Sequence, residues 1–294
     1  MFNQLGVIGC GLMGGSFALA LKRAGMVRRV IGYSKSPSTT ERARQLGVID
    51  SAAGSALLAV AGSDIVLIAV PVAASEATFK AIRHLVEPGV LVMDVGSTKR
   101  DVVDAARRVL KERIGWFVPA HPIAGKEASG IGHADAALYH GRSAILTPLP
   151  ETEPEAVRKA LEAWAAVGAQ VLLMTPENHD AAFAAVSHLP HLLAFAYLNA
   201  ITGQPAGRDF LALAGPGFRD FTRIAAGDPV VWRDILLANR AEVARQSAHF
   251  RAALDAIEQA LVAGDAQALE TLIQGASKAR AGWQMSDVKP PPAR

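Results

Sequence analysis

A glycine pattern near the N-terminus constrains the fold of this chain more than any other feature. The short apolar run Leu5–Ile8 is followed directly by Gly9-Cys10-Gly11-Leu12-Met13-Gly14 and then by a stretch with helical periodicity. The first glycine of such a pattern permits a tight turn, the second lets a ligand approach the backbone, and the third lets the helix pack on the strand. Because helix N-termini attract phosphate groups, the pattern predicts a strand, a turn and a helix that bind a dinucleotide.

The first half of the chain alternates β-branched runs with helical patterns, which is typical of a parallel sheet built from βαβ units. The expected strands are Leu5–Ile8, Val30–Tyr33, Ile65–Ala69, Leu91–Val95, Trp116–Val118, Ser143–Leu146 and Val171–Met174. The expected helices between them are Leu12–Ala24, Thr40–Leu46, Ala74–Leu85, Arg100–Glu112 and Pro154–Val167. We therefore expect residues 1–175 to form an α/β N-terminal domain of the Rossmann type that binds a dinucleotide.

From Pro176 onward the pattern is purely helical. Segments rich in alanine and leucine cover His179–Ala200, Val230–Leu261 and Asp265–Ala281. Residues 176–288 are therefore expected to form an all-α C-terminal domain, and the proline-rich residues 289–294 a flexible tail. A chain of 294 residues is long enough for two such domains.

The composition excludes several classes of protein. The formal net charge is only +3 and the basic residues are spread along the chain, so no nucleic-acid-binding stripe is expected. Cys10 is the only cysteine, which excludes an intrachain disulfide and suits a reducing cytoplasm. Residues 1–21 lack a basic start and contain several glycines, and Asp64 and Pro71 interrupt the apolar residues 51–75. We therefore expect a soluble, cytoplasmic protein without a membrane span.

The residues after the second expected strand bear on the choice of cofactor. Enzymes that use NAD normally offer an acidic residue to the ribose hydroxyls at this position. This chain has Ser34 and Lys35 there, and hydroxyl and ammonium groups can hold the 2′-phosphate of NADP. NADP is therefore favoured over NAD, while NAD stays open if Lys35 is only a solvated loop residue.

Polar residues also follow two later strands of the expected sheet. In an open α/β sheet the carboxyl ends of the strands face the ligand crevice. Ser97 and Lys99 follow Leu91–Val95, so either side chain can reach the nicotinamide end, and Ser97 can also cap the next helix. His121 follows Trp116–Val118, which makes it a candidate for a general base.

The helical half supplies further polar candidates. His188 and His191 share one helix face, but no further ligands with suitable spacing accompany them, so no metal site is expected. Pro190 between them is expected to kink the helix. Arg219 and Arg223 lie among glycine, phenylalanine and threonine residues, and arginines near a cleft can pair with a carboxylate through two N–H groups.

Taken in order, these residues resemble the prephenate/arogenate dehydrogenase family of tyrosine biosynthesis. The resemblance covers nearly the whole chain. Its motifs are GxGxxG at Gly9–Gly14, DVGSTK at Asp94–Lys99, HPIAGKExSG at His121–Gly130, SHLPH at Ser187–His191, FRDFTRIA at Phe218–Ala225 and DPxxWRDI at Asp228–Ile235. Together they are far more specific than any one of them.

The resemblance implies roles for particular residues. His121 would be the catalytic histidine that bonds the substrate 4-hydroxyl, and Ser97 would orient that pair. The residues implied in substrate binding are Glu127, His188, His191, Arg223 and Trp232. The residues implied in cofactor binding are Gly9, Gly11, Leu12, Met13, Gly14, Ser34 and Lys35. Many members have aspartate where this chain has Ser34, so the resemblance leaves both NADP and NAD open.

The implied reaction is the oxidative decarboxylation of prephenate to 4-hydroxyphenylpyruvate, with hydride transfer to NADP or NAD. Arogenate dehydrogenase, which gives tyrosine directly, is the near alternative because the two substrates differ only at a keto or amino group. β-Hydroxyacid dehydrogenases begin with a similar glycine motif, but they use a lysine on the first long helix of the second domain. This chain has no lysine between Lys159 and Lys278, which argues against that class of enzyme. A regulator that senses NADP without turnover is the alternative from another class, and it would not need His121.

The helical half carries alanine and leucine on more than one helix face. This is more apolar surface than a small helical domain buries alone, so we expect residues 176–285 to form a homodimer. The expected partners are therefore a small-molecule substrate and a second copy of the chain, with no nucleic acid and no membrane.

Overall fold

The computed structural model describes residues 1–125 and 128–284, and the chain divides into two compact units. The first unit comprises Met1–Ala182 and Arg223–Asn239, and the second comprises Phe183–Thr222 and the chain from Arg240 onward. The expected combination of an α/β domain with a helical domain is confirmed. The boundary expected after residue 175 stays a prediction, and the compact units divide differently because Arg223–Asn239 packs within the first one.

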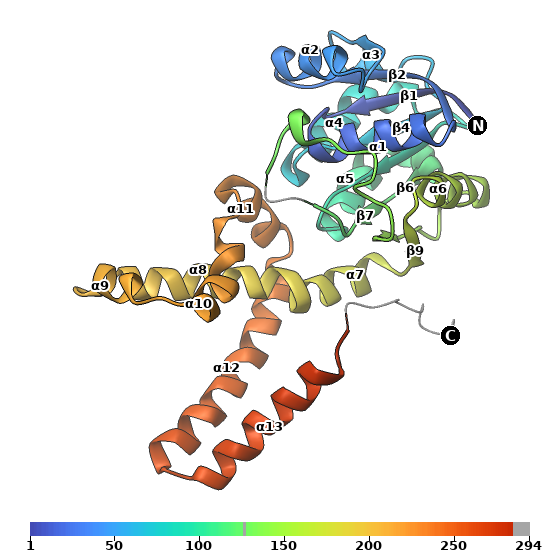
Figure 1. Cartoon of the computed structure of the whole chain (residues 1–294). Coiled ribbons are helices and arrows are strands. Elements are labelled where there is room, and N and C mark those ends of the chain that lie inside the picture. The colour runs from blue at the N-terminus through green and yellow to red at the C-terminus, as the bar shows by residue number, and fades with distance from the viewer. Residues whose placement is uncertain (126–127, 285–294) are drawn as a thin grey trace. The chain divides into compact units, whose positions relative to one another are not determined.

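Within the described residues, the first unit contains a six-stranded parallel sheet with the order β3-β2-β1-β4-β5-β6. Figure 1 labels β1, β2, β4 and β6 of this sheet. Its strands are β1 (Phe2–Ile8), β2 (Val27–Tyr33), β3 (Ser51–Ala52), β4 (Ile65–Ile68), β5 (Leu91–Asp94) and β6 (Phe117–Val118). The strand order reverses between β1 and β4. In doubly wound sheets, ligands bind at such a reversal, outside the carboxyl ends of the strands.

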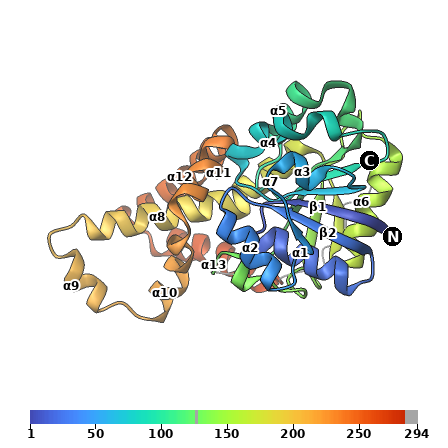
Figure 2. The ribbon, with the colours of Figure 1, turned by 90° about the horizontal axis from the view of Figure 1, so that it is seen from above.

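Side chains along these strands alternate between two cores. Leu5 and Val7 of β1 lie in one core, whereas Ile8 lies in the other, as a period of two residues requires. Helices α1 (Leu12–Arg23), α2 (Pro37–Gln45) and α6 (Pro154–Ala166) contribute to the first core, and α3 (Ala56–Val60), α4 (Ser75–Ile82) and α5 (Arg100–Leu110) to the second. Figure 2 shows α1 and α2 on one side of β1 and β2, and α3 and α4 on the other. The sheet is thus covered on both faces, and its carboxyl edge remains for a ligand.

The described part of the first unit also contains a second sheet of three strands. They are β7 (Ala120–Pro122), β8 (Ser143–Leu146) and β9 (Gln170–Leu173), in that order. The expectation that all strands form one parallel sheet is therefore wrong, because β7 pairs antiparallel with β8 and starts a separate sheet. His121 lies on β7, opposite Ile145.

The remaining α-helices of the described residues follow β9. They are α7 (Pro176–Phe183), α8 (Leu189–Thr202), α9 (Gly207–Ala212), α10 (Pro216–Thr222), α11 (Pro229–Ala238), α12 (Arg240–Ala263) and α13 (Ala266–Gly282). The helical segment expected over Val230–Leu261 is divided between α11 and α12, on either side of Asn239. Asn239 is buried, and its side-chain amide donates a hydrogen bond of 2.8 Å to the main-chain oxygen of Asp180. This tertiary contact holds the end of α11 against α7 and explains the break.

The second unit is helical throughout its described elements. Helix α12 turns into α13 at Gly264, whose φ is +67°, and Asp265 caps α13 by accepting the Ala268 N–H at 2.9 Å. The irregularity expected at Pro190 takes the form of a π-helical turn over Ala184–His188. Proline lacks the N–H that would continue the regular α-helical bonding, which accounts for a change of spacing just before it.

Among the described residues, one continuous helix, Pro176–Thr202, has the length and the mean hydropathy of 1.4 that a membrane span requires. It comprises α7, the π-helical turn and α8. Core helices of soluble proteins meet the same criteria, so this helix alone does not place the chain in a membrane.

Candidate active site

The glycine pattern forms the turn between β1 and α1, and its glycines have different surroundings. Gly9 has a φ of +100°, and a Cβ atom added there would lie 2.1 Å from the main-chain oxygen of Ala69. A Cβ atom at Gly14 would lie 2.2 Å from the oxygen of Gly9, whereas one at Gly11 would meet no described atom within 4 Å. The outer glycines therefore allow close packing, and Gly11 borders open space at the N-terminus of α1. This space fits the pyrophosphate of a dinucleotide.

A pocket of about 480 Å³ lies beside this turn. Gly9, Ser34 and Lys35 line it, together with small apolar side chains such as Ala56 of α3 and Ala77 of α4. The apolar walls suit an adenine ring, and the hydroxyl and ammonium groups suit a ribose and its phosphate. The residues present thus fit NAD or NADP.

Ser34 is fixed by two hydrogen bonds. Its Oγ accepts the N–H of Cys10 at 2.8 Å, and its own N–H donates to Oγ1 of Thr40 at 2.9 Å. Because Oγ acts as an acceptor toward Cys10, its hydroxyl hydrogen can donate to a ligand oxygen in the pocket. Burial raises the pKa of the Cys10 thiol to about 11, so no thiolate forms beside the phosphate-binding turn at neutral pH.

A second pocket, of about 200 Å³, shares the segment Ala69–Pro71 with the first. Met13 and Ser97 line it, and Ile235 of α11 contributes another wall. The two pockets adjoin at this segment, beside the carboxyl ends of β1, β4 and β5, and are together called the crevice below. The structure thus brings Ser97 and Met13 together at the end of the crevice away from Ser34, while Leu12 packs against the first core.

The DVGSTK motif forms a loop that a buried ion pair holds in place. The Nζ atom of Lys99 lies 2.5 Å from Oδ2 of Asp94 and donates to the main-chain oxygen of Ala120 at 2.7 Å. The other carboxylate oxygen of Asp94 accepts the Ala120 N–H at 2.9 Å. Lys99 is fully buried, so the expectation that it can reach the nicotinamide end is wrong. Its charge instead joins the loop that carries Ser97 to the start of β7.

His121, His179 and Asp180 form a hydrogen-bonded chain. The Nδ1 atom of His121 lies 2.8 Å from Nε2 of His179, and Nδ1 of His179 lies 2.7 Å from Oδ1 of Asp180. His179 is 0% and Asp180 1% exposed, whereas His121 is partly exposed. An imidazole backed by a second imidazole and a carboxylate is a suitable general base.

Asp180 also caps helix α5. Its two carboxylate oxygens accept the N–H groups of Lys99 at 2.8 Å and of Arg100 at 3.0 Å. The alternative interpretation of Ser97 as the cap of this helix is therefore wrong, because Asp180 occupies that role from a distant segment.

Sequence reasoning missed His179 and Asp180 as site residues. They lie 58 residues or more from His121 along the chain, and no linear spacing relates them. The available signal was an adjacent histidine and aspartate near the start of the helix that follows β9, close to the expected carboxyl edge of a sheet.

Two predicted substrate-binding residues belong to the first unit. Arg223 is exposed at the start of a short 3₁₀ turn, and Trp232 is half-buried on α11. Trp232 packs on Gly227, where an added Cβ atom would lie 2.3 Å from the indole Nε1. The roles of Arg223 and Trp232 toward a substrate stay predictions.

Two other predicted residues belong to the second unit. His188 is buried in the π-helical turn, and Nδ1 of His191 lies 2.9 Å from the main-chain oxygen of Ser187. Glu127 lies outside the described residues.

Across residues 1–125 and 128–284, no group of three or more histidine, cysteine, aspartate or glutamate side chains is arranged to hold a metal ion.

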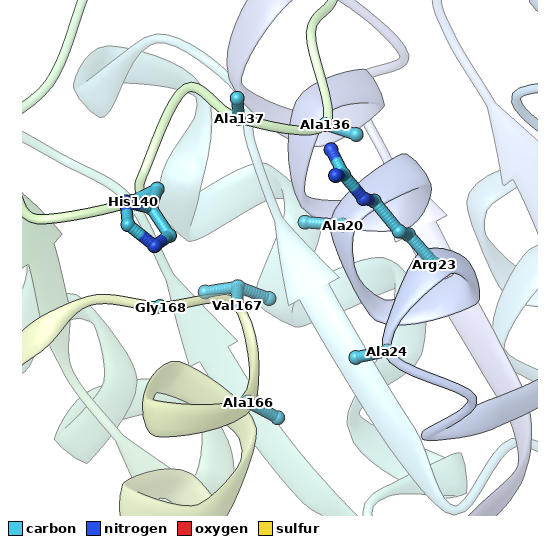
Figure 3. Close-up of a pocket in the computed structure, with 9 residues that line it drawn as sticks. All are labelled: Ala20, Arg23, Ala24, Ala136, Ala137, His140, Ala166, Val167 and Gly168. Atoms are coloured by element: carbon cyan, nitrogen blue, oxygen red, sulfur yellow. The ribbon is translucent and has the colours of Figure 1, made fainter.

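A separate pocket of about 550 Å³ lies outside the crevice (Figure 3). Most of its lining is alanine, and Arg23 and His140 stand on different walls. Helix α1 runs against the direction of the strands, so its C-terminal residue Arg23 lies at the amino edge of the sheet. This position excludes the pocket as the dinucleotide site.

Two family models match this chain. One is described as the nucleotide-binding domain of prephenate dehydrogenase and matches residues 17–173, and the other is described as its dimerization domain and matches residues 175–275. Together they cover most of both units.

Individual proteins show the same similarity. Prephenate dehydrogenase of Bacillus subtilis is 37% identical over 248 residues, which are 83% of this chain and 66% of the relative. Cyclohexadienyl dehydrogenase of Zymomonas mobilis is 32% identical over 293 residues, which are 99% of both chains. Prephenate dehydrogenase of A. aeolicus, solved with hydroxyphenyl propionate and NAD+, has a TM-score of 0.88 at 34% identity, covering 96% of this chain and 98% of that one.

Proposed function

The chain belongs to the prephenate dehydrogenase family of oxidoreductases, and on that premise we propose that it oxidises prephenate to 4-hydroxyphenylpyruvate and CO2 with NAD(P)+ as the hydride acceptor. The observation that carries the proposal is the position of His121. It lies on the strand that the buried Asp94–Lys99 pair fastens to the cofactor crevice. Its Nδ1 is engaged with His179, so Nε2 is the nitrogen suited to meet a substrate hydroxyl.

The proposed chemistry divides between cofactor and protein. When bound, the oxidised nicotinamide supplies the acceptor for the hydride that leaves C4 of prephenate. Nε2 of His121 takes up the hydroxyl proton as carbonyl character develops at C4, and Ser97 orients the hydroxyl toward it. The ring carboxylate leaves as CO2, the ring becomes aromatic, and the product phenol regains a proton from His121.

The remaining predicted residues hold the substrate. Prephenate carries two carboxylates, and the guanidinium of Arg223 is suited to pair with one of them through two N–H groups. Trp232, Glu127, His188 and His191 are proposed to complete substrate binding. Holding C4 against the nicotinamide contributes to the rate by proximity.

A steady-state assay tests this function. Formation of reduced nicotinamide is measured for prephenate or arogenate, each with NAD+ or NADP+. We expect the highest kcat/KM with prephenate. A higher kcat/KM with arogenate would assign the alternative substrate, and cofactor binding without any turnover would indicate a regulator that senses NADP.

We propose that NADP is the preferred cofactor, because Ser34 and Lys35 line the adenosine end of the crevice. Replacing Ser34 with aspartate should reverse the preference, since a carboxylate accepts hydrogen bonds from the ribose hydroxyls and repels a 2′-phosphate. The KM values for both cofactors are compared in the parent and in Ser34→Asp, with Ser34→Ala as the control that adds no charge. Equal KM values for the two cofactors in the parent and in Ser34→Asp would show that this loop does not discriminate.

We propose that the second unit joins two copies of the chain. Large apolar side chains of α12 and α13 are exposed in the single chain, among them Leu261 at 63%, Val262 at 88% and Ile273 at 54%. Of the 24 residues of α12, only Val243 and Ala260 are buried. A second copy would cover this surface, in line with an obligate interface.

Sedimentation equilibrium of the full chain should therefore give the mass of a dimer at micromolar concentration. A charge placed on the exposed surface, as in Leu261→Asp, should shift the equilibrium toward the monomer, whereas Leu57→Asp on α3 of the first unit should not. A parent that sediments as a monomer would contradict the proposal.

We also propose that the dimer is soluble and cytoplasmic, with Pro176–Thr202 serving as a helix of its interior rather than as a membrane span.

A further inference from the structure

We propose that Asp180 and His179 act as positioning residues that hold His121 in the one tautomer able to accept a proton at Nε2. The inference rests on the proposed function of His121 and extends it to two residues that do not need to touch the substrate. It is carried by the chain of hydrogen bonds from Asp180 through His179 to His121.

The direction of these hydrogen bonds follows from the state of Asp180. Its carboxylate accepts the N–H groups of Lys99 and Arg100, and both belong to the N-terminal end of α5, where the helix dipole is positive. Main-chain N–H groups can only donate, so both oxygens of Asp180 act as acceptors. These contacts favour the ionised carboxylate.

An ionised carboxylate then determines which ring nitrogen carries the hydrogen in each of the two imidazoles. Asp180 can only accept, so Nδ1 of His179 carries the hydrogen in their 2.7 Å bond. In a neutral His179, Nε2 is then the acceptor. The 2.8 Å bond to His121 therefore takes its hydrogen from Nδ1 of His121, and the lone pair of His121 is on Nε2.

The same arrangement supports the charge that forms during the reaction. When Nε2 of His121 takes up a proton, the imidazolium keeps its Nδ1–H bond to His179, and the negative charge of Asp180 lies one imidazole away. Other charged groups near the pair are Asp101 on α5 and the Lys99–Asp94 ion pair. Burial raises the pKa of the Asp101 carboxyl, and the ammonium of Lys99 lies against Asp94. Asp180 is thus the carboxylate in direct line with the two histidines.

Three separate elements position the relay, which is the hydrogen-bonded chain of Asp180, His179 and His121. His121 is on β7, His179 and Asp180 are on α7, and the N–H groups that fix the carboxylate open α5. The amide of Asn239 at the end of α11 also donates to the main-chain oxygen of Asp180. A positioning role requires this kind of support, because a small rotation of the imidazole would misdirect Nε2.

The tautomer can be measured without turnover. In the full chain labelled with ¹⁵N-histidine, at a pH where the histidines are neutral, NMR should show His121 and His179 both protonated at Nδ1 and not at Nε2. Resonances are assigned by comparison with His121→Asn and His179→Gln. His121 protonated at Nε2 in the parent would overturn the proposal.

Kinetics of four variants, one of them a control, supply the second test. His179→Leu leaves Nδ1 of His121 without an acceptor and should lower kcat with prephenate by about a hundredfold, at nearly unchanged KM. His179→Gln should recover part of this loss, because its side-chain oxygen can accept the same hydrogen. Asp180→Asn should also lower kcat and raise the fraction of His121 protonated at Nε2. Asp101→Asn, which alters a neighbouring carboxyl of α5 outside the relay, should stay within about twofold of the parent.

The outcomes separate the relay from the proposed reaction. A parent with the expected tautomer but no turnover would contradict the reaction and support the relay. A parent that turns over while His179→Leu and Asp180→Asn keep full kcat would contradict the relay and leave the reaction standing. If Asp180→Asn fails to fold, because it also caps α5, the comparison of His179→Leu with His179→Gln decides.

Discussion

Replacing His121 with asparagine is expected to lower kcat for prephenate by about a hundredfold or more, with little change in KM or in cofactor affinity. The reason is that the imidazole acts on a proton that moves only in the reaction, whereas the substrate is held by other groups. The parent should also lose activity at low pH, where protonation removes the acceptor at Nε2, and this acid limb should be absent from the variant. Steady-state kinetics across pH, with cofactor binding by fluorescence titration, measure both effects.

The matched control is His140→Asn, because His140 is an exposed histidine of the same unit that lines the separate pocket of Figure 3. It should retain the parent's kcat and acid limb. A His121→Asn enzyme that keeps both would show that the base lies elsewhere, with His188 and His191 as the next candidates.

Alanine at Gly9 is expected to destabilise the first unit by about 3 kcal/mol or more. An added Cβ atom would lie 2.1 Å from the main-chain oxygen of Ala69, and the φ of +100° is one that side chains other than glycine rarely adopt. Backbone atoms on both sides cannot move away without disturbing β1 and β4. Urea unfolding of the parent and the variant gives the difference in the free energy of unfolding.

Gly11→Ala is the informative companion to Gly9→Ala. An added Cβ atom there meets no described atom within 4 Å, so the free energy of unfolding should change by less than about 1 kcal/mol. The same Cβ atom would occupy the approach of the pyrophosphate, so the Kd for NAD(P)+ should rise about tenfold or more. A Gly11→Ala protein that binds the cofactor as the parent does would mean that the dinucleotide lies elsewhere.

The sequence predicts best those features that local residues determine. The runs Leu5–Ile8 and Leu91–Val95 become strands of the parallel sheet because their apolar residues fill the cores on both of its faces. The glycine pattern between β1 and α1 predicts the turn that joins them. Strands β3 and β7 escaped prediction because they are short and owe their pairing to neighbours far along the chain. Pro122 in β7 also weakens the local signal for a strand.

The site divides in the same way. The position of Ser34 beside the glycine turn follows from the order of strands and loops. His121 was expected just after the strand Trp116–Val118, and it lies instead within the short strand β7 of the second sheet. The partners of His121 do not follow from that order, because His179 and Asp180 reach it only after β9 has returned the chain to the same region. For Lys99 the sequence predicted a contact that the structure does not show. Its place after a strand suggested that it contacts a ligand, but its ammonium binds the buried carboxylate of Asp94 on that same strand. The hydrogen-bond and ion-pair partners of a buried side chain depend on the tertiary fold, so the spacing of residues along the chain does not predict them.

The most direct test of the central claim is the stoichiometry of a single incubation of the full chain with prephenate and NADP+ or NAD+. Reduced nicotinamide is followed by its absorbance, CO2 is trapped and counted, and the aromatic product is identified by chromatography. We expect equal amounts of reduced nicotinamide, CO2 and 4-hydroxyphenylpyruvate, formed at least about a hundredfold more slowly by His121→Asn. Cofactor bound at the glycine turn with no reduced nicotinamide formed from prephenate, or reduced nicotinamide formed without CO2, would contradict the proposed reaction.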